Sequence, residues 1–182
     1  MPHTPIREET IYNGRVFDLV RATFRLPNEK EHTYDLVKHH GAVTIVPLDD
    51  SGNIWFVRQF RIGPGETLLE LPAGLLEEGE AAAATAAREV QEEIGMAARS
   101  MEELGSFYMV PGYSTEKLTA YLATGLYDST LPGDEDEFLE RVSLPAGEVF
   151  TMIRAGQIQD GKTLAALLLA LPRLAHLQGV LK

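Results

Sequence analysis

The feature that most constrains the fold of this chain is one stretch of 23 residues, GLLEEGEAAAATAAREVQEEIGM, at positions 74–96. Its centre is rich in alanine, the residue with the highest helix propensity. Near its end stands Gly95, and glycine often ends a helix because it adopts the left-handed conformation without strain. The stretch therefore predicts a helix over residues 80–94 that ends at Gly95.

Three carboxylates crowd the end of this predicted helix. Glu89 and Glu93 are four residues apart and share one helical face, and Glu92 flanks the same face. Like charges this close destabilise a helix unless a positive charge offsets them. A hard divalent cation such as Mg²⁺ or Mn²⁺ takes oxygen ligands of this kind. The alternative is an acidic face that is simply exposed to solvent.

The same stretch resembles the signature of the Nudix hydrolase family. That signature is a glycine, five residues, a glutamate, seven residues, Arg-Glu, an aliphatic residue, any residue, Glu-Glu, any residue, a glycine and an aliphatic residue. With each fixed residue at about 6–7 % usage, its seven fixed positions match by chance on the order of once in 10⁸ starts. The chain fills the pattern with Gly74, Glu80, Arg88, Glu89, Val90, Glu92, Glu93, Gly95 and Met96.

The resemblance implies a fold and a chemistry. The fold is of the α/β class: a Nudix-type α/β/α sandwich with a mixed sheet, to which this chain adds a small N-terminal β-sheet. The chemistry is hydrolysis of a diphosphate linked to another group, with divalent cations that neutralise charge and activate a water molecule. By the resemblance, the cation ligands are Glu89, Glu93, Glu137 and the carbonyl of Ala73, and the catalytic machinery includes Glu92 and Arg88, the latter as a partner that orients a ligand. The expected cofactor is Mg²⁺, with Mn²⁺ as the alternative.

The rest of the sequence predicts a mixed sheet and two closing helices. Short runs of β-branched and aromatic residues predict strands, and the turns PNEK and DDSG separate two pairs of them. Residues 1–40 are expected to form an N-terminal β element used for dimerisation, and residues 41–182 the Nudix hydrolase domain. Strands are expected at residues 14–26, 32–40, 41–48, 53–62, 67–73, 106–110, 117–124 and 138–144, and the closing helices at 146–158 and 162–177.

Two later segments resemble the ADP-ribose pyrophosphatase subgroup of the family. Pro111 lies fifteen residues after the signature, and with Gly112 and Glu116 it is expected to contact substrate, although the segment could be an ordinary Pro-Gly turn. An acidic loop precedes the strand expected at residues 138–144. There the resemblance places a general base at Glu135 and the further metal ligand at Glu137, while the two roles could be reversed. The alternative is a solvated acidic run.

Three more residues are expected to bind substrate by the same resemblance. Arg61 would contact the substrate phosphates or ribose, and Glu70 would lie in the substrate pocket. Phe17 would stack on the base. Each could instead be an ordinary strand residue. Because relatives build a homodimer from their N-terminal sheets, a homodimer is also expected here.

Composition restricts the partners and the compartment. A net charge of −11 repels a nucleic-acid backbone, so no nucleic-acid partner is expected. No apolar run approaches the roughly 18 residues of a membrane span, and residues 1–10 lack the apolar stretch of a signal peptide. The chain has no cysteine, which suits a reducing compartment. The expectation is a cytoplasmic protein without a membrane partner.

Three functions remain open from the sequence. The favoured function is metal-dependent hydrolysis of ADP-ribose to AMP and ribose 5-phosphate. A second is hydrolysis of another nucleoside diphosphate sugar or a dinucleotide. The third is a non-catalytic Nudix domain that senses a nucleotide, although such domains usually lose signature glutamates that this chain retains.

Overall fold

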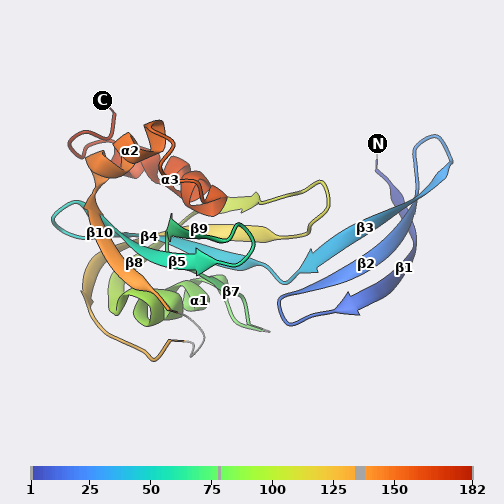
Figure 1. The fold of residues 1–182 in the computed structure, drawn as a ribbon, viewed down its shortest axis with the longest axis horizontal. Coiled ribbons are helices and arrows are strands. Elements are labelled where there is room, and N and C mark those ends of the chain that lie inside the picture. The colour runs from blue at the N-terminus through green and yellow to red at the C-terminus, as the bar shows by residue number, and fades with distance from the viewer. Residues whose placement is uncertain (1, 78, 134–137, 182) are drawn as a thin grey trace. The chain divides into compact units, whose positions relative to one another are not determined.

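The computed structural model describes residues 2–77, 79–133 and 138–181 and divides into two compact units (Figure 1). One unit comprises Met1–Gly41 and Tyr108–Lys117. The other comprises Ala42–Phe107 and Leu118–Lys182 and contains the whole signature. The N-terminal unit is therefore made of two segments of the chain, where the sequence predicted a single one.

The N-terminal unit is a three-stranded antiparallel sheet. Its strands are β1 (Thr4–Asn13), β2 (Phe17–Arg25) and β3 (Glu31–His39), in the order β1-β2-β3. The turn predicted at PNEK joins β2 to β3, and Glu29 adopts a positive φ of 63° within it. β1 was not predicted because its sequence, TPIREETIYN, is mostly polar, and all ten of its residues are exposed. Pairing with β2 rather than burial makes this segment a strand.

The larger unit is built on a mixed seven-stranded sheet. The strand order is β10-β5-β4-β9-β8, with β6 paired to β5 and β7 paired to β4. β4 runs parallel to β9 and antiparallel to β5 and β7. The strands are β4 (Ala42–Leu48), β5 (Asn53–Arg61), β6 (Glu66–Glu70), β7 (Ala73–Leu75), β8 (Met96–Tyr108), β9 (Lys117–Asp128) and β10 (Glu140–Pro145).

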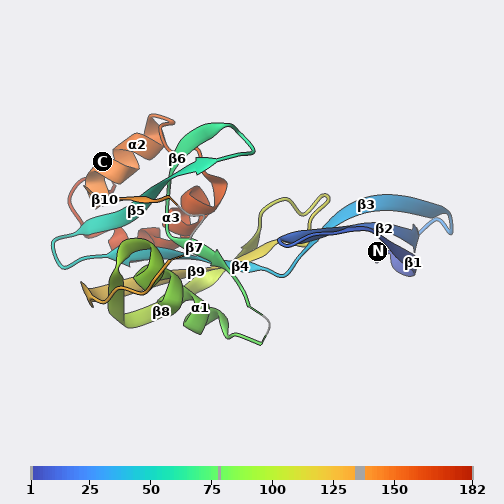
Figure 2. The ribbon, with the colours of Figure 1, turned by 60° about the horizontal axis from the view of Figure 1, so that its bottom comes forward.

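Helices cover both faces of this sheet (Figures 1 and 2). They are α1 (Ala82–Glu89), the π-helix η1 (Val90–Ile94), α2 (Ala146–Arg154) and α3 (Gly161–Leu174). Side chains alternate across β4, so Val43 and Ile45 pack in the core under α1, while Val46 packs in the core under α2 and α3. The predicted α/β sandwich with a mixed sheet and a small additional sheet is confirmed. Among the described residues, no helix is long and apolar enough to cross a membrane.

Several predicted boundaries were wrong. The expected helix over residues 80–94 begins at Ala82 and changes from α to π geometry after Glu89. The strand expected at residues 106–110 begins already at Met96. Its sequence, MAARSMEELGSFY, has no clear alternation of apolar and polar residues, so its extended form was not visible locally.

Candidate functional site

Two glutamates of the signature are buried where α1 passes into η1. Glu89 is 8 % exposed and Glu93 is 4 % exposed, which is unusual for carboxylates. Gly95 ends η1 with φ 73°, and its N–H donates to the Val90 carbonyl. π-helical turns are rare and occur often at functional sites. The end of the signature helix is thus an irregular element that carries buried charge.

Strand β7 approaches these two glutamates closely. A Cβ atom built on Gly74 would lie 1.8 Å from Oε1 of Glu89, so any other residue there would displace the Glu89 carboxylate. The neighbouring residue, Ala73, donates its N–H to Oε2 of Glu93 at 3.1 Å. β7 is held in place by antiparallel pairing with β4, where Gly74 faces Val43. The backbone of β7 and the two buried carboxylates therefore converge.

Arg88 bridges three carboxylates of the signature, which lie before α1, in α1 and in η1. Its Nη1 lies 2.8 Å from Oε1 of Glu89 and 2.7 Å from Oε2 of Glu92. Its Nε and Nη2 donate to the carboxylate of Glu80 at 3.4 Å. Burial lowers the pKa of Arg88, but the hydrogen bonds to Glu80 and Glu92 and the charge of Glu89 outweigh it and raise that pKa. One guanidinium thus contacts three carboxylates, so this group of side chains keeps an excess of negative charge.

The donor set fits a divalent cation. Glu89 and Glu93 are buried carboxylates that lie against two neighbouring residues of β7, Gly74 and Ala73, and hard cations prefer oxygen ligands. Within residues 2–77, 79–133 and 138–181, no three His, Asp or Glu side chains already enclose a metal position. A cation bound at Glu89 and Glu93 would complete its coordination with other oxygen ligands, for which backbone carbonyls, further carboxylates and water are all suited.

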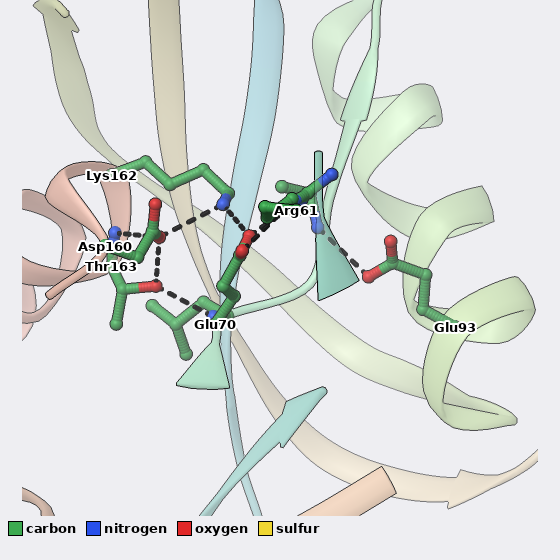
Figure 3. Close-up of polar contacts among 8 residues, drawn as sticks. Arg61, Glu70, Glu93, Asp160, Lys162 and Thr163 are labelled. Atoms are coloured by element: carbon green, nitrogen blue, oxygen red, sulfur yellow. Dashed lines mark hydrogen bonds and ion pairs between the residues drawn. The ribbon is translucent and has the colours of Figure 1, made fainter. Parts of the chain in front are cut away.

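A second charged cluster surrounds Glu70 at the end of β6 (Figure 3). Glu70 is 1 % exposed and accepts hydrogen bonds from Nε of Arg61 at 2.8 Å and from Nη2 at 2.7 Å. Nζ of Lys162 donates to the same carboxylate from the other side. Burial raises the pKa of Glu70, but the hydrogen bonds and charges of Arg61 and Lys162 outweigh it and hold that pKa below its usual value.

The first turn of α3 completes this cluster. Asp160 caps the helix by accepting from the Thr163 N–H at 3.0 Å, and it also accepts from Thr163 Oγ1 at 2.6 Å and from Lys162 Nζ at 3.0 Å. Oγ1 of Thr163 accepts the Leu71 N–H at 2.8 Å. Asp160, Lys162 and Thr163 were not predicted as site residues from the sequence. The available signal was an aspartate directly before an apolar helical run, which marks a helix start.

The structure places four other predicted substrate residues in the N-terminal unit. They are Phe17, Pro111, Gly112 and Glu116. The segment that carries the last three is held to β3, because the Val37 N–H donates to the Tyr113 carbonyl at 2.8 Å and the Thr115 N–H donates to the Val37 carbonyl at 2.9 Å. The predicted base and further metal ligand, Glu135 and Glu137, lie outside the described residues.

The sequence of this chain is similar to that of known proteins. A family model described as a NUDIX domain matches residues 38–167. The chain belongs to the Nudix family. It is 36 % identical to the ADP-ribose pyrophosphatase of Bacillus subtilis (strain 168) over 164 residues, which are 89 % of each chain. It is 39 % identical to the ADP-ribose pyrophosphatase of Mycobacterium tuberculosis over 166 residues, which are 90 % of this chain and 80 % of the relative.

A solved structure also resembles this Nudix protein along nearly its whole length. The crystal structure of an ADP compounds hydrolase superposes with a TM-score of 0.86 at 27 % identity, covering 99 % of this chain and 97 % of that chain. The resemblance recognised in residues 74–96 is thus confirmed, and the names of the two pyrophosphatase relatives agree with the subgroup recognised from Pro111.

Proposed function

We propose that this Nudix protein hydrolyses the diphosphate of ADP-ribose, consuming one water molecule and releasing AMP and ribose 5-phosphate. The observation that carries the proposal is the approach of two buried signature carboxylates to neighbouring residues of β7, Glu89 to Gly74 and Glu93 to the backbone N–H of Ala73. The two relatives named ADP-ribose pyrophosphatase support the choice of substrate.

The cation site is the chemical centre of this proposal. Nudix hydrolases generally depend on divalent metal, and Mg²⁺ is the cation that we propose here, with Mn²⁺ as the alternative. Glu89, Glu93 and the carbonyl of Ala73 would hold it, together with Glu137. When bound, the cations supply charge neutralisation of the diphosphate and activation of water.

The remaining roles are divided between charge control and proton transfer. Arg88 orients Glu89 and Glu92 through contacts of one nitrogen, Nη1, at 2.8 and 2.7 Å, so that these carboxylates keep their positions before a cation arrives. Arg61 presents positive charge to a substrate phosphate. Glu135 accepts the proton of the attacking water, since the helix carboxylates are committed to cations.

The other substrate contacts of the proposal belong to the N-terminal unit. Phe17 is 42 % exposed, so its ring is available to stack on the adenine base. Pro111, Gly112 and Glu116, in the segment that follows β8, are proposed substrate contacts of this unit. We also propose a homodimer, because β1 exposes all ten of its residues at one edge of the small sheet.

A second candidate substrate class follows from the solved structure. Its description as an ADP compounds hydrolase is wider than ADP-ribose and favours a test of other nucleoside diphosphate sugars and dinucleotides. Purified protein should therefore be assayed with Mg²⁺ against a panel of such compounds, with the products identified. ADP-ribose should give the highest kcat/KM and yield AMP with ribose 5-phosphate. A higher kcat/KM for another member of the panel would contradict the proposed substrate.

The metal assignment is tested by removing one charge at a time. Glu89→Gln and Glu93→Gln change little volume, and each should lower turnover by about 10²-fold or more while circular dichroism stays unchanged. Glu102→Gln, which alters an exposed carboxylate paired with Arg173, is the matched control and should keep normal turnover. Normal turnover in either folded signature variant would overturn the assignment.

A further inference from the structure

Glu70 presents an electrostatic problem that the proposed reaction does not by itself explain. Its carboxylate is 1 % exposed, so it has lost nearly all contact with water. A buried carboxylate is costly unless opposite charges and hydrogen bonds compensate it. Two cations meet it, Arg61 from β5 and Lys162 from α3, and Figure 3 shows the carboxylate between them. One cation would neutralise the charge of the Glu70 carboxylate, so the presence of a second cation needs an explanation.

Arg61 uses only one edge of its guanidinium for Glu70. The two hydrogen bonds come from Nε and Nη2, which form one side of the planar group. The other donor edge of the guanidinium, formed by Nη1 and the second N–H of Nη2, is not used for Glu70. The Arg61 side chain remains 38 % exposed. A planar fork of this kind suits bidentate binding of a phosphate.

The contact with Glu70 would nevertheless weaken Arg61 as a phosphate ligand. A bidentate ion pair between one arginine and one carboxylate has no net charge, so it attracts an anion poorly. A second positive charge on the same carboxylate changes this balance, because Glu70 with both Arg61 and Lys162 carries a net positive charge.

The start of α3 positions Lys162 beside the Glu70 carboxylate. Its side chain is 13 % exposed and donates to Asp160 as well as to Glu70. Asp160 is itself the cap of α3, so its negative charge lies at the positive end of the helix dipole and is shared with the Thr163 N–H and Oγ1. The charge of Asp160 is therefore largely satisfied by the helix, and Lys162 remains available to offset Glu70.

We propose that Lys162 is a positioning residue that neutralises Glu70, so that Arg61 keeps a net positive charge and an outward edge for a phosphate of a nucleoside diphosphate. This inference rests on the proposed function. It assigns a distinct role to Lys162, which lies 92 residues after Glu70 in the chain. The role concerns substrate binding and is separate from the holding of cations by the signature carboxylates, although the charge of Glu93 also acts on Arg61.

Steady-state kinetics of Lys162→Met test the proposal. The variant should raise the KM for ADP-ribose by about tenfold and change kcat by less than a factor of about three. Lys162→Gln, which keeps a hydrogen-bond donor but no charge, should show the same increase and provides a second variant if the methionine protein does not fold. Arg173→Met removes an exposed ion pair from the other end of the same helix and should leave both constants unchanged.

A double substitution separates charge neutralisation from simple packing. In a Glu70→Gln background there is no carboxylate to neutralise, so adding Lys162→Met should change KM by less than about twofold. Calorimetric binding of ADP-ribose in a Glu93→Gln background, where hydrolysis is slow, should show the same weakening by Lys162→Met without relying on turnover.

The outcomes distinguish this inference from the proposed function. A folded Lys162→Met or Lys162→Gln protein with an unchanged KM would overturn the role of Lys162 while leaving the reaction in place. Equal increases in KM with Glu70 intact and in the Glu70→Gln background would also overturn it, since the effect would then be independent of the carboxylate. If the wild-type protein prefers another nucleoside diphosphate sugar, the proposed substrate fails, and the same comparison is made with that sugar.

Discussion

At the scale of single residues, Gly74 is the position where one added carbon should matter most. Its Cβ would fall 1.8 Å from Oε1 of Glu89, so Gly74→Ala must push that carboxylate aside. Displacement of a catalytic group by about 1 Å can cost about 10²-fold in rate. Turnover should therefore fall by about this factor, and the Mg²⁺ concentration needed for half-maximal rate should rise.

A second glycine provides the control for this prediction. A Cβ on Gly63, in the turn between β5 and β6, would meet nothing within 4 Å, so Gly63→Ala adds the same atom without displacing a side chain. Both proteins should fold, as judged by circular dichroism and thermal unfolding. Equal turnover in the two variants would show that the close approach of β7 to Glu89 has no catalytic consequence.

Also at this scale, Glu70 should make the free energy of unfolding depend on acid pH. Arg61 and Lys162 hold its folded-state pKa below the ordinary value of 4.5. A lowered folded-state pKa gives stability that is present above 4.5 and is lost as pH falls through the folded-state pKa. The deficit of Glu70→Gln relative to wild type should therefore be largest near neutral pH and shrink below about pH 4.5 in urea denaturation. A deficit independent of pH would contradict this.

At the scale of elements, the signature helix shows what a local pattern can and cannot predict. Its alanines and Gly95 predicted a helix and its end, and both are present. The change from α1 to η1 was not predicted from the sequence, and it occurs where Glu89 and Glu93 lie against β7, a strand of only three residues that comes from before the helix. The charged cluster around Glu70 could not be predicted from the sequence either, because Lys162 belongs to α3 and is 92 residues away from Glu70 along the chain.

The start of α3 allows a prediction about that helix. Asp160→Ala removes the acceptor for the Thr163 N–H, Thr163 Oγ1 and Lys162 Nζ. Loss of a helix cap costs about 1–2 kcal/mol, and urea denaturation should show a decrease of at least this size in the free energy of unfolding. Asp160→Asn keeps an acceptor for the Thr163 N–H and should lose less. An alanine variant as stable as wild type would mean that α3 does not depend on its cap.

At the scale of the whole molecule, the two units differ in how much of their structure the sequence predicted. Runs of β-branched and aromatic residues predicted strands at β4, β5 and β9, and these strands carry much of the two cores. The N-terminal unit was harder, because β1 is fully exposed and the segment Tyr108–Lys117 joins the unit from a later part of the chain. Such a contact is tertiary and leaves no periodicity in either segment.

The exposed strand β1 makes the assembly state testable. Ile6, Ile11 and Tyr12 are 45 %, 45 % and 59 % exposed, and among the described residues β1 pairs with β2 alone. Native proteins seldom leave an apolar edge strand uncovered. We therefore expect a homodimer that buries more than the roughly 1,200 Å² of a weak contact and is seen by light scattering at micromolar concentration.

A charge placed on this strand should disrupt the dimer. Ile11→Glu would bury an unpaired carboxylate in the interface, which is strongly unfavourable, so light scattering should show a monomer. Leu181→Glu places the same charge on an exposed apolar residue of the other unit and should leave the dimer intact. If Ile11→Glu remains dimeric, β1 does not form the interface. A wild-type protein that is monomeric and fully active at micromolar concentration would overturn the proposed homodimer.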